Sequence, residues 1–112
     1  MSNVIYKIVT FLAIALGVVH LAFTACLDAF DLNALWFFGS GLAIIFAGFL
    51  NLALIRISPK DSLVRALCIV ANLTVTILFI IALLTVLQEP QVFVGIGIFA
   101  LATVFSFLQT DK

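Results

Sequence analysis

Four long apolar runs leave this chain little choice of fold. They cover residues 4–27, 33–56, 63–87 and 91–109. Each run is long enough to cross a hydrocarbon core ~30 Å thick, which takes about 20 helical residues. The runs are apolar on all faces, as a membrane helix is, whereas a membrane barrel needs alternating polarity over many more strands. The sequence therefore predicts an all-α membrane protein, with four transmembrane helices forming a single domain over residues 1–112.

The composition indicates the same surroundings. Hydrophobic residues make up 66% of the 112-residue chain and charged residues 9%, and the charges gather where the apolar runs meet. Such gathering is typical of a chain in a bilayer, because a charge within the hydrocarbon is costly. The formal net charge is zero, so there is no electrostatic reason to expect nucleic acid as a partner. The expected surroundings are the lipid bilayer, and no nucleic-acid partner is predicted.

The connections between the runs are short and carry signals for the start and end of helices. Asp31 or Asn33 can cap the second helix, Pro59 ends the second run, and Pro90 suits the first position of the fourth helix. Short connections make consecutive helices antiparallel neighbours. The expected arrangement is an up-down-up-down bundle.

The basic residues predict the orientation of this bundle. They all fall on the side that holds the two termini and the 57–62 connection: Lys7, Arg56, Lys60, Arg65 and Lys112. The opposite side carries Asp28, Asp31 and Glu89. The positive-inside rule then predicts an integral membrane protein whose N- and C-termini are both cytoplasmic.

Polar side chains inside the spans are the first candidates for a site, because each needs a partner or a water-lined cavity. His20 is the only histidine and lies in the outer half of the first span, with Thr24 one turn further out on the same face. Trp36 and Ser40 lie in the outer half of the second span. We expect these four residues to form an outward-facing pocket that binds an apolar or amphipathic small molecule. The alternative is a neutral imidazole that only hydrogen-bonds a neighbouring helix.

Catalytic and metal chemistry lack the residues that they need. One histidine, with no second histidine and no intramembrane carboxylate, supplies too few ligands for a metal or a haem. Intramembrane catalysis usually needs paired acids, a nucleophile with a base, or a metal. Cys26 and Cys68 lie on opposite sides of the predicted midplane, ~25 Å apart at ~1.5 Å per residue, which is too far for a disulfide. We predict no catalytic residue, no metal site, no cofactor and no enzymatic activity.

Packing residues are predicted on the second and third spans. Small residues and an asparagine recur there at spacings of four, a pattern that lets helix backbones approach closely: Gly39, Ala43, Ala47 and Asn51, with Gly41 and Gly48 beside them. The pattern suits a contact inside the bundle or a homo-oligomer. Asn72 lies at a depth similar to that of Asn51, so the two amides are expected to pair across helices.

Two short segments resemble parts of uncharacterised small bacterial four-helix inner-membrane proteins. The segments are Gly17-Val18-Val19-His20, and Trp36-Phe37-Phe38-Gly39-Ser40-Gly41 followed by Gly48 and Asn51. The resemblance covers about half of the chain, and it implies a bacterial inner membrane but no activity. In size alone the chain is similar to small multidrug resistance exporters. That family depends on a glutamate within its first helix, and the first span here has no carboxylate, so export is not implied.

Three classes of function remain open. The first is a bundle that binds a small molecule near His20. The second is a structural or accessory subunit that packs against a larger membrane protein or against itself. The third is a small transporter or channel assembled as an oligomer, because four helices enclose little space by themselves.

Overall fold

The computed structural model describes residues 2–27, 29–85 and 89–110, and this part of the chain forms four α-helices. They are α1 (Ser2–Ala25), α2 (Leu32–Arg56), α3 (Ser62–Thr85) and α4 (Pro90–Phe107). All four are long and apolar enough to cross a membrane. The prediction of an all-helical chain with four candidate membrane spans is confirmed.

Local side chains explain where the helices begin. Asp31 Oδ1 accepts a hydrogen bond from the Ala34 N–H at 2.9 Å, and Asp61 Oδ1 accepts from Leu63 and Val64 N–H at 2.8 and 3.1 Å. These bonds satisfy backbone donors that have no partner within the first turn of a helix. Pro90, which has no N–H to satisfy, is the first residue of α4.

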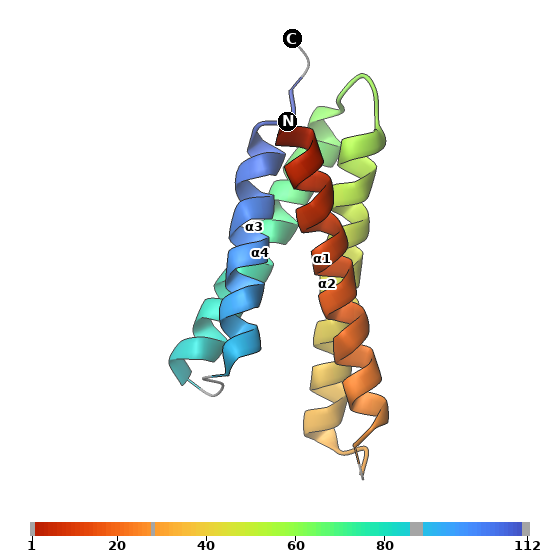
Figure 1. Cartoon of the computed structure of the whole chain (residues 1–112), viewed down its shortest axis with the longest axis vertical. Helices are drawn as coiled ribbons and strands as arrows, with labels where there is room; N and C mark the ends of the chain where they lie inside the picture. The colour runs from red at the N-terminus through yellow and green to blue at the C-terminus, as the bar shows by residue number, and fades with distance from the viewer. Residues whose placement is uncertain (1, 28, 86–88, 111–112) are drawn as a thin grey trace.

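The helices are arranged as two hairpins, α1 with α2 and α3 with α4 (Figure 1). The hairpins meet at the end that holds the start of α1, the end of α4 and residues 57–61, and they diverge toward the other end (Figure 1). Where the hairpins meet, Gln109 Nε2 donates to Asn3 Oδ1 at 3.1 Å and so links α1 to the residues after α4.

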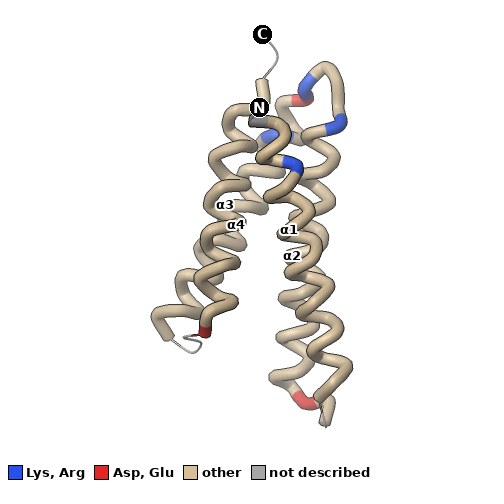
Figure 2. The backbone as a smooth tube through the Cα atoms, viewed as in Figure 1, with Lys and Arg blue, Asp and Glu red and all other residues tan. Residues whose placement is uncertain are grey.

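The same two ends also differ in their charged residues. Among the described residues every lysine and arginine lies toward the end where the hairpins meet, which we call the basic end: Lys7, Arg56, Lys60 and Arg65 (Figure 2). Asp61 accompanies them, whereas Asp31 and Glu89 lie at the opposite end, which we call the far end (Figure 2). Lys112 and Asp28, which the sequence placed on opposite sides, lie outside the described residues.

Glycines bring α1 and α2 into close contact. A Cβ added to Gly17 would lie 2.9 Å from the Gly41 carbonyl oxygen, and one added to Gly48 would lie 2.5 Å from Ile14 Cγ1. Only a hydrogen fits at these positions. The first hairpin therefore packs backbone against backbone over several turns.

The predicted small-residue pattern on α2 is split between two faces. Ala47 and Asn51 are buried, whereas Gly39 and Ala43 are exposed, and no atom lies within 4 Å of a Cβ added to Gly39. A helix has 3.6 residues per turn, so each step of four residues drifts by ~40°, or ~120° from Gly39 to Asn51. Gly41 and Gly48 are seven residues apart and differ by only ~20°, so both can face α1.

The hydrophobic core draws on all four helices in the middle of the bundle. Its buried members are Val9, Ala13, Ile44, Ala47, Val75, Ile98, Phe99 and Ala102.

Candidate functional site

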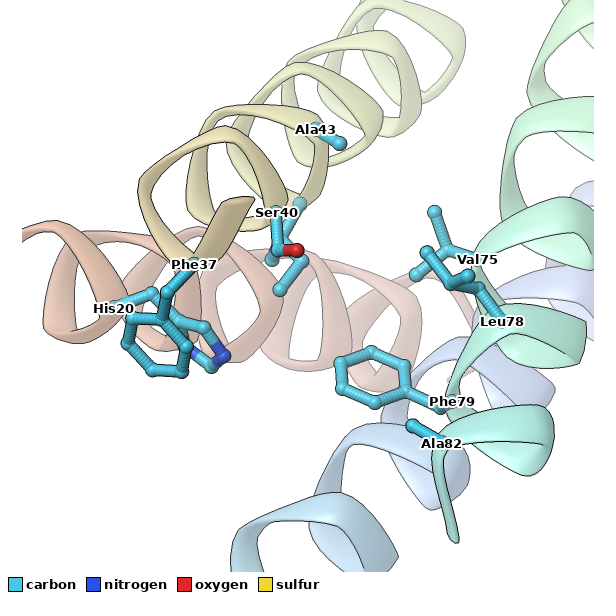
Figure 3. A pocket seen from close by; sticks show the side chains of 9 residues that line it. His20, Phe37, Ser40, Ala43, Val75, Leu78, Phe79 and Ala82 are labelled. Carbon is cyan, nitrogen blue, oxygen red and sulfur yellow. The ribbon is translucent and has the colours of Figure 1, made fainter. Parts of the chain in front are cut away.

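A cavity of about 110 Å³ lies between the first hairpin and α3. Its walls come from two sides, with His20, Phe37, Ser40, Ala43 and Ile44 on α1 and α2, and Val75, Leu78, Phe79 and Ala82 on α3 (Figure 3). His20, Phe37 and Phe79 all lie nearer to the far end than to the basic end of their helices. The cavity therefore occupies the half of the molecule in which the hairpins diverge.

His20 is the most polar group that faces this cavity. Its Nδ1 lies 2.9 Å from the Leu16 carbonyl oxygen, which can only accept, so Nδ1 carries the hydrogen of this bond. In this tautomer Nε2 is an acceptor, and the hydrogen bonds of the described part of the chain include none to it. The imidazole is 7% exposed and stacks on Phe37, with ring centroids 4.5 Å apart and an interplanar angle of 13°. The backbone bond and the stacking fix the orientation of the ring.

Ser40 supplies a second polar atom. Its hydroxyl donates to the Trp36 carbonyl oxygen at 2.9 Å, one turn earlier on α2. The Ser40 oxygen still has lone pairs that can accept, although its proton is already used. The other side chains that line the cavity are apolar. The cavity thus presents two acceptor atoms in an apolar wall, which suits an apolar molecule that carries a hydroxyl or an N–H group.

The other two predicted pocket residues lie outside this cavity. Thr24 is buried, and its hydroxyl donates to the His20 carbonyl oxygen at 2.9 Å. Trp36 is 68% exposed on the outer surface of α2. The sequence predicted a pocket in the outer half of the first hairpin, but at Gly17 and Gly41 the backbones of α1 and α2 are in close contact. The cavity that His20 lines lies between the hairpins instead.

Sequence reasoning missed the α3 wall. Val75, Leu78, Phe79 and Ala82 recur at helical spacings of three and four, so the sequence does place them on one face. In a span that is apolar all round, however, this spacing does not distinguish a cavity wall from a lipid-facing surface.

Gly95 on α4 leaves space for the aromatic ring of Phe79, which lines the cavity. A Cβ added to Gly95 would lie between 2.7 and 2.9 Å from three atoms of the Phe79 ring. The ring also stacks with Phe99, at 6.1 Å between centroids and an interplanar angle of 29°. Phe79 therefore lies against the backbone of α4. Because Phe79 lines the cavity, the size of the cavity depends on this position of its ring.

The rim of the cavity lies on the side of the bundle. Ala43 on α2 and Leu78 on α3 are exposed and line it from opposite hairpins. In a membrane-spanning chain, such a lateral surface faces acyl chains.

A second group of polar residues lies toward the basic end, and its side chains pack against one another. We call it the polar cluster: Tyr6 on α1, Asn51 on α2, Cys68 and Asn72 on α3, and Ser106 on α4, all buried. The two asparagines exchange hydrogen bonds of 2.7 and 2.8 Å between their amides. Tyr6 donates its hydroxyl to Asn51 Oδ1 at 2.5 Å, and Cys68 Sγ donates to the same oxygen at 3.2 Å.

The polar cluster contains a residue from each helix and so joins the two hairpins. Asn72 Nδ2 also lies within 3.4 Å of Ser106 Oγ, which adds α4 to the set. The donors of the cluster bond to one another and to backbone carbonyl groups of their own helices, so the role of the cluster is to hold the helices together.

No group of three His, Cys, Asp or Glu side chains that could hold a metal ion occurs among residues 2–27, 29–85 and 89–110. Comparison with protein-family models, with curated proteins and with solved structures finds no match for this chain.

Proposed function

We propose that this chain is an integral protein of a bacterial inner membrane that binds a small apolar or amphipathic molecule in the His20 cavity. One observation carries the proposal: a histidine held by Leu16 and Phe37 directs a ring nitrogen, without a partner among the described residues, at a cavity whose other lining side chains are apolar except for Ser40. An ionisable side chain within a membrane span is costly to keep, and it commonly marks a functional site.

The dimensions of the cavity limit the molecule. An apolar protein cavity of about 150 Å³ takes up benzene, so a cavity of about 110 Å³ encloses at most one ring or an alkyl segment of similar bulk. A hydroxyl or N–H on that ring would donate to His20 Nε2. A longer apolar tail would leave through the lateral rim between Ala43 and Leu78.

The proposed orientation places the basic end, with both termini, in the cytoplasm. It follows from the four described basic residues near that end and from the positive-inside rule. The four spans then alternate in direction, as an up-down-up-down bundle. The His20 cavity lies in the half of the membrane away from the cytoplasm, where a molecule in the outer leaflet has access to it.

The test compares two probes that differ by one donor group. We expect 4-fluorophenol to bind the purified protein in micelles more tightly than fluorobenzene, as measured by ¹⁹F NMR titration. His20→Phe keeps a ring beside Phe37 and removes Nε2, so the preference for the phenol should fall about five- to tenfold, the equivalent of one hydrogen bond. Val19→Ala, an exposed neighbour, is the matched control. Equal binding of the two probes to the unmodified protein would refute the proposal.

A second candidate is an accessory subunit that acts through helix-helix contacts. It is favoured by Gly39, which is exposed on α2 with no atom within 4 Å of an added Cβ. A small residue on an outer face allows another helix to approach closely. Gly39→Leu should then reduce oligomer size or partner retention in light scattering, and should leave probe binding at His20 unchanged. No change in assembly would remove this candidate.

A further inference from the structure

Another hollow, of about 150 Å³, lies at the basic end, where α3 begins and residues 109–110 follow α4. It is lined by Lys60, Ser62, Arg65, Gln109 and Thr110. Two of these five side chains are cations and the other three can hydrogen-bond. This lining differs from that of the His20 cavity, which is almost entirely apolar.

Backbone carbonyl groups hold both cations in position. Lys60 Nζ donates to the Leu54 and Ile55 carbonyl oxygens at 2.7 and 3.0 Å. Arg65 donates to the Phe107 carbonyl oxygen through Nε at 3.3 Å and one terminal nitrogen at 2.9 Å. The carbonyl groups at the C-terminal turns of α2 and α4 carry partial negative charge, which favours a cation there. The positive charges at the hollow are therefore fixed by the fold and do not depend on free side-chain motion.

Among the described residues, the charge of the basic end is positive overall. The described charged residues of this end are Lys7, Arg56, Lys60, Arg65 and Asp61. Asp61 directs one carboxylate oxygen at the N–H groups of Leu63 and Val64, at the start of α3. Four basic residues against one acidic residue favour an anionic occupant.

We propose that this hollow binds the phosphate of an anionic phospholipid headgroup. The hollow lies where spans end, which in a bilayer is the boundary between hydrocarbon and headgroups. Basic pockets between transmembrane helices at this depth suit lipid phosphates. A lipid is favoured over a soluble anion because its acyl chains keep its phosphate at this depth and raise its local concentration. The proposal is independent of any ligand at His20.

The experiment measures lipid selectivity in the full chain. Purified protein in micelles is titrated with phosphatidylglycerol and with phosphatidylcholine of the same chain length, and the lipid retained is measured by native mass spectrometry. We expect phosphatidylglycerol to be retained preferentially. Lys60→Gln and Arg65→Gln should each reduce that retention about fivefold, since a basic residue near an anionic lipid contributes roughly that factor.

Matched controls separate a site from diffuse attraction. Lys7→Gln and Arg56→Gln remove the same charge from the same end without touching the lining of the hollow, and they should leave retention nearly unchanged. Equal losses in all four variants would overturn the proposal in favour of general electrostatic attraction. If Arg65→Gln does not fold, Arg65→Lys, which keeps the charge, and Lys60→Gln carry the test.

A third arm addresses the source of the phosphate. Inorganic phosphate alone is titrated against the unmodified protein and against Lys60→Gln. Phosphate binding that depends on Lys60, together with no preference for phosphatidylglycerol, would identify a soluble-anion site and refute the lipid proposal. Preference for phosphatidylglycerol without measurable binding of phosphate alone would support it.

Discussion

The two ends of this molecule are built from the same four helices but are held together differently. Toward the basic end, the polar cluster joins the hairpins through amide, hydroxyl and thiol groups. Toward the far end, the hairpins diverge around an apolar cavity whose polar side chains are His20 and Ser40. Among the described residues, the side-chain hydrogen bonds between the hairpins lie toward the basic end, and the His20 cavity between the hairpins lies toward the far end.

The difference between the two ends has a physical cause, which is that lipid and not water surrounds a membrane span. Within a membrane, an apolar side chain gains little from touching another helix, because acyl chains are equally apolar. A buried amide or hydroxyl, in contrast, is costly without a partner. Asn51 and Asn72 therefore require the hairpins to meet at their depth, whereas Leu78 and Ala82 impose no such requirement. Polar residues decide where these hairpins touch, and apolar stretches allow them to separate.

The largest expected effect comes from breaking the polar cluster. Asn51→Leu removes the oxygen that accepts from Tyr6, Cys68 and Asn72, and leaves these donors buried. We expect the free energy of unfolding to fall by about 3 kcal/mol, as measured by denaturation with sodium dodecyl sulfate in mixed micelles. Asn33→Leu, at an exposed position of the far end, is the control. Equal losses in the two variants would contradict a special role for the cluster.

The next prediction concerns the contact between α1 and α2 in the half of the first hairpin that lies away from the polar cluster. Gly41→Val would place atoms 3.1 Å or less from the Gly17 carbonyl oxygen and the side chain of His20. We expect a loss of about 2 kcal/mol in the same measurement, the usual size for overpacking.

Gly39→Val is the matched control for this change. It introduces the same side chain on the same helix, into space that has no atom within 4 Å. If Gly39→Val destabilised the protein as much as Gly41→Val, helix propensity and not the contact with α1 would be the cause.

A smaller effect is expected toward the far end, where the His20 cavity lies. Gly95→Ala should push the Phe79 ring into the cavity and weaken fluorobenzene binding about fivefold, a loss of the order of 1 kcal/mol. Adding Phe79→Leu to the same chain should restore binding. Gly97→Ala has no atom within 4 Å and should have no effect. Weaker binding that Phe79→Leu does not restore would show that Gly95 acts by another route.

The smallest effect concerns a polar group that joins no hydrogen-bond network. Thr10, one turn from Tyr6, is 1% exposed, and its hydroxyl has no hydrogen-bond partner within the part of the chain that the structure describes. Thr10→Val removes a buried group that the fold does not satisfy, so the free energy of unfolding should stay the same or rise by up to about 1 kcal/mol. Thr103→Val, which removes a hydroxyl bonded to the Phe99 carbonyl oxygen, is the comparison. A clear loss in Thr10→Val would show that this hydroxyl has a partner after all.

The sequence by itself determined the four helices and the separation of charge along them. Both follow from the bilayer as solvent, since a spanning segment must satisfy its own backbone hydrogen bonds and exclude charge. It also singled out His20, and it paired Asn51 with Asn72, because few polar groups lie inside the spans and their depth can be counted along a helix. These features depend on one helix at a time, or on two helices at one depth.

Only the tertiary structure decided which faces meet. It placed the cavity between the hairpins and not inside the first one, left Trp36 and Gly39 on the outer surface, and added Tyr6 and Cys68 to the asparagine pair. The sequence could not supply these facts, because a helix that is apolar on all sides has no face that its composition marks as inward. The rotation of each span is set by its neighbours, through the close approach at Gly41 and the hydrogen bonds of the polar cluster.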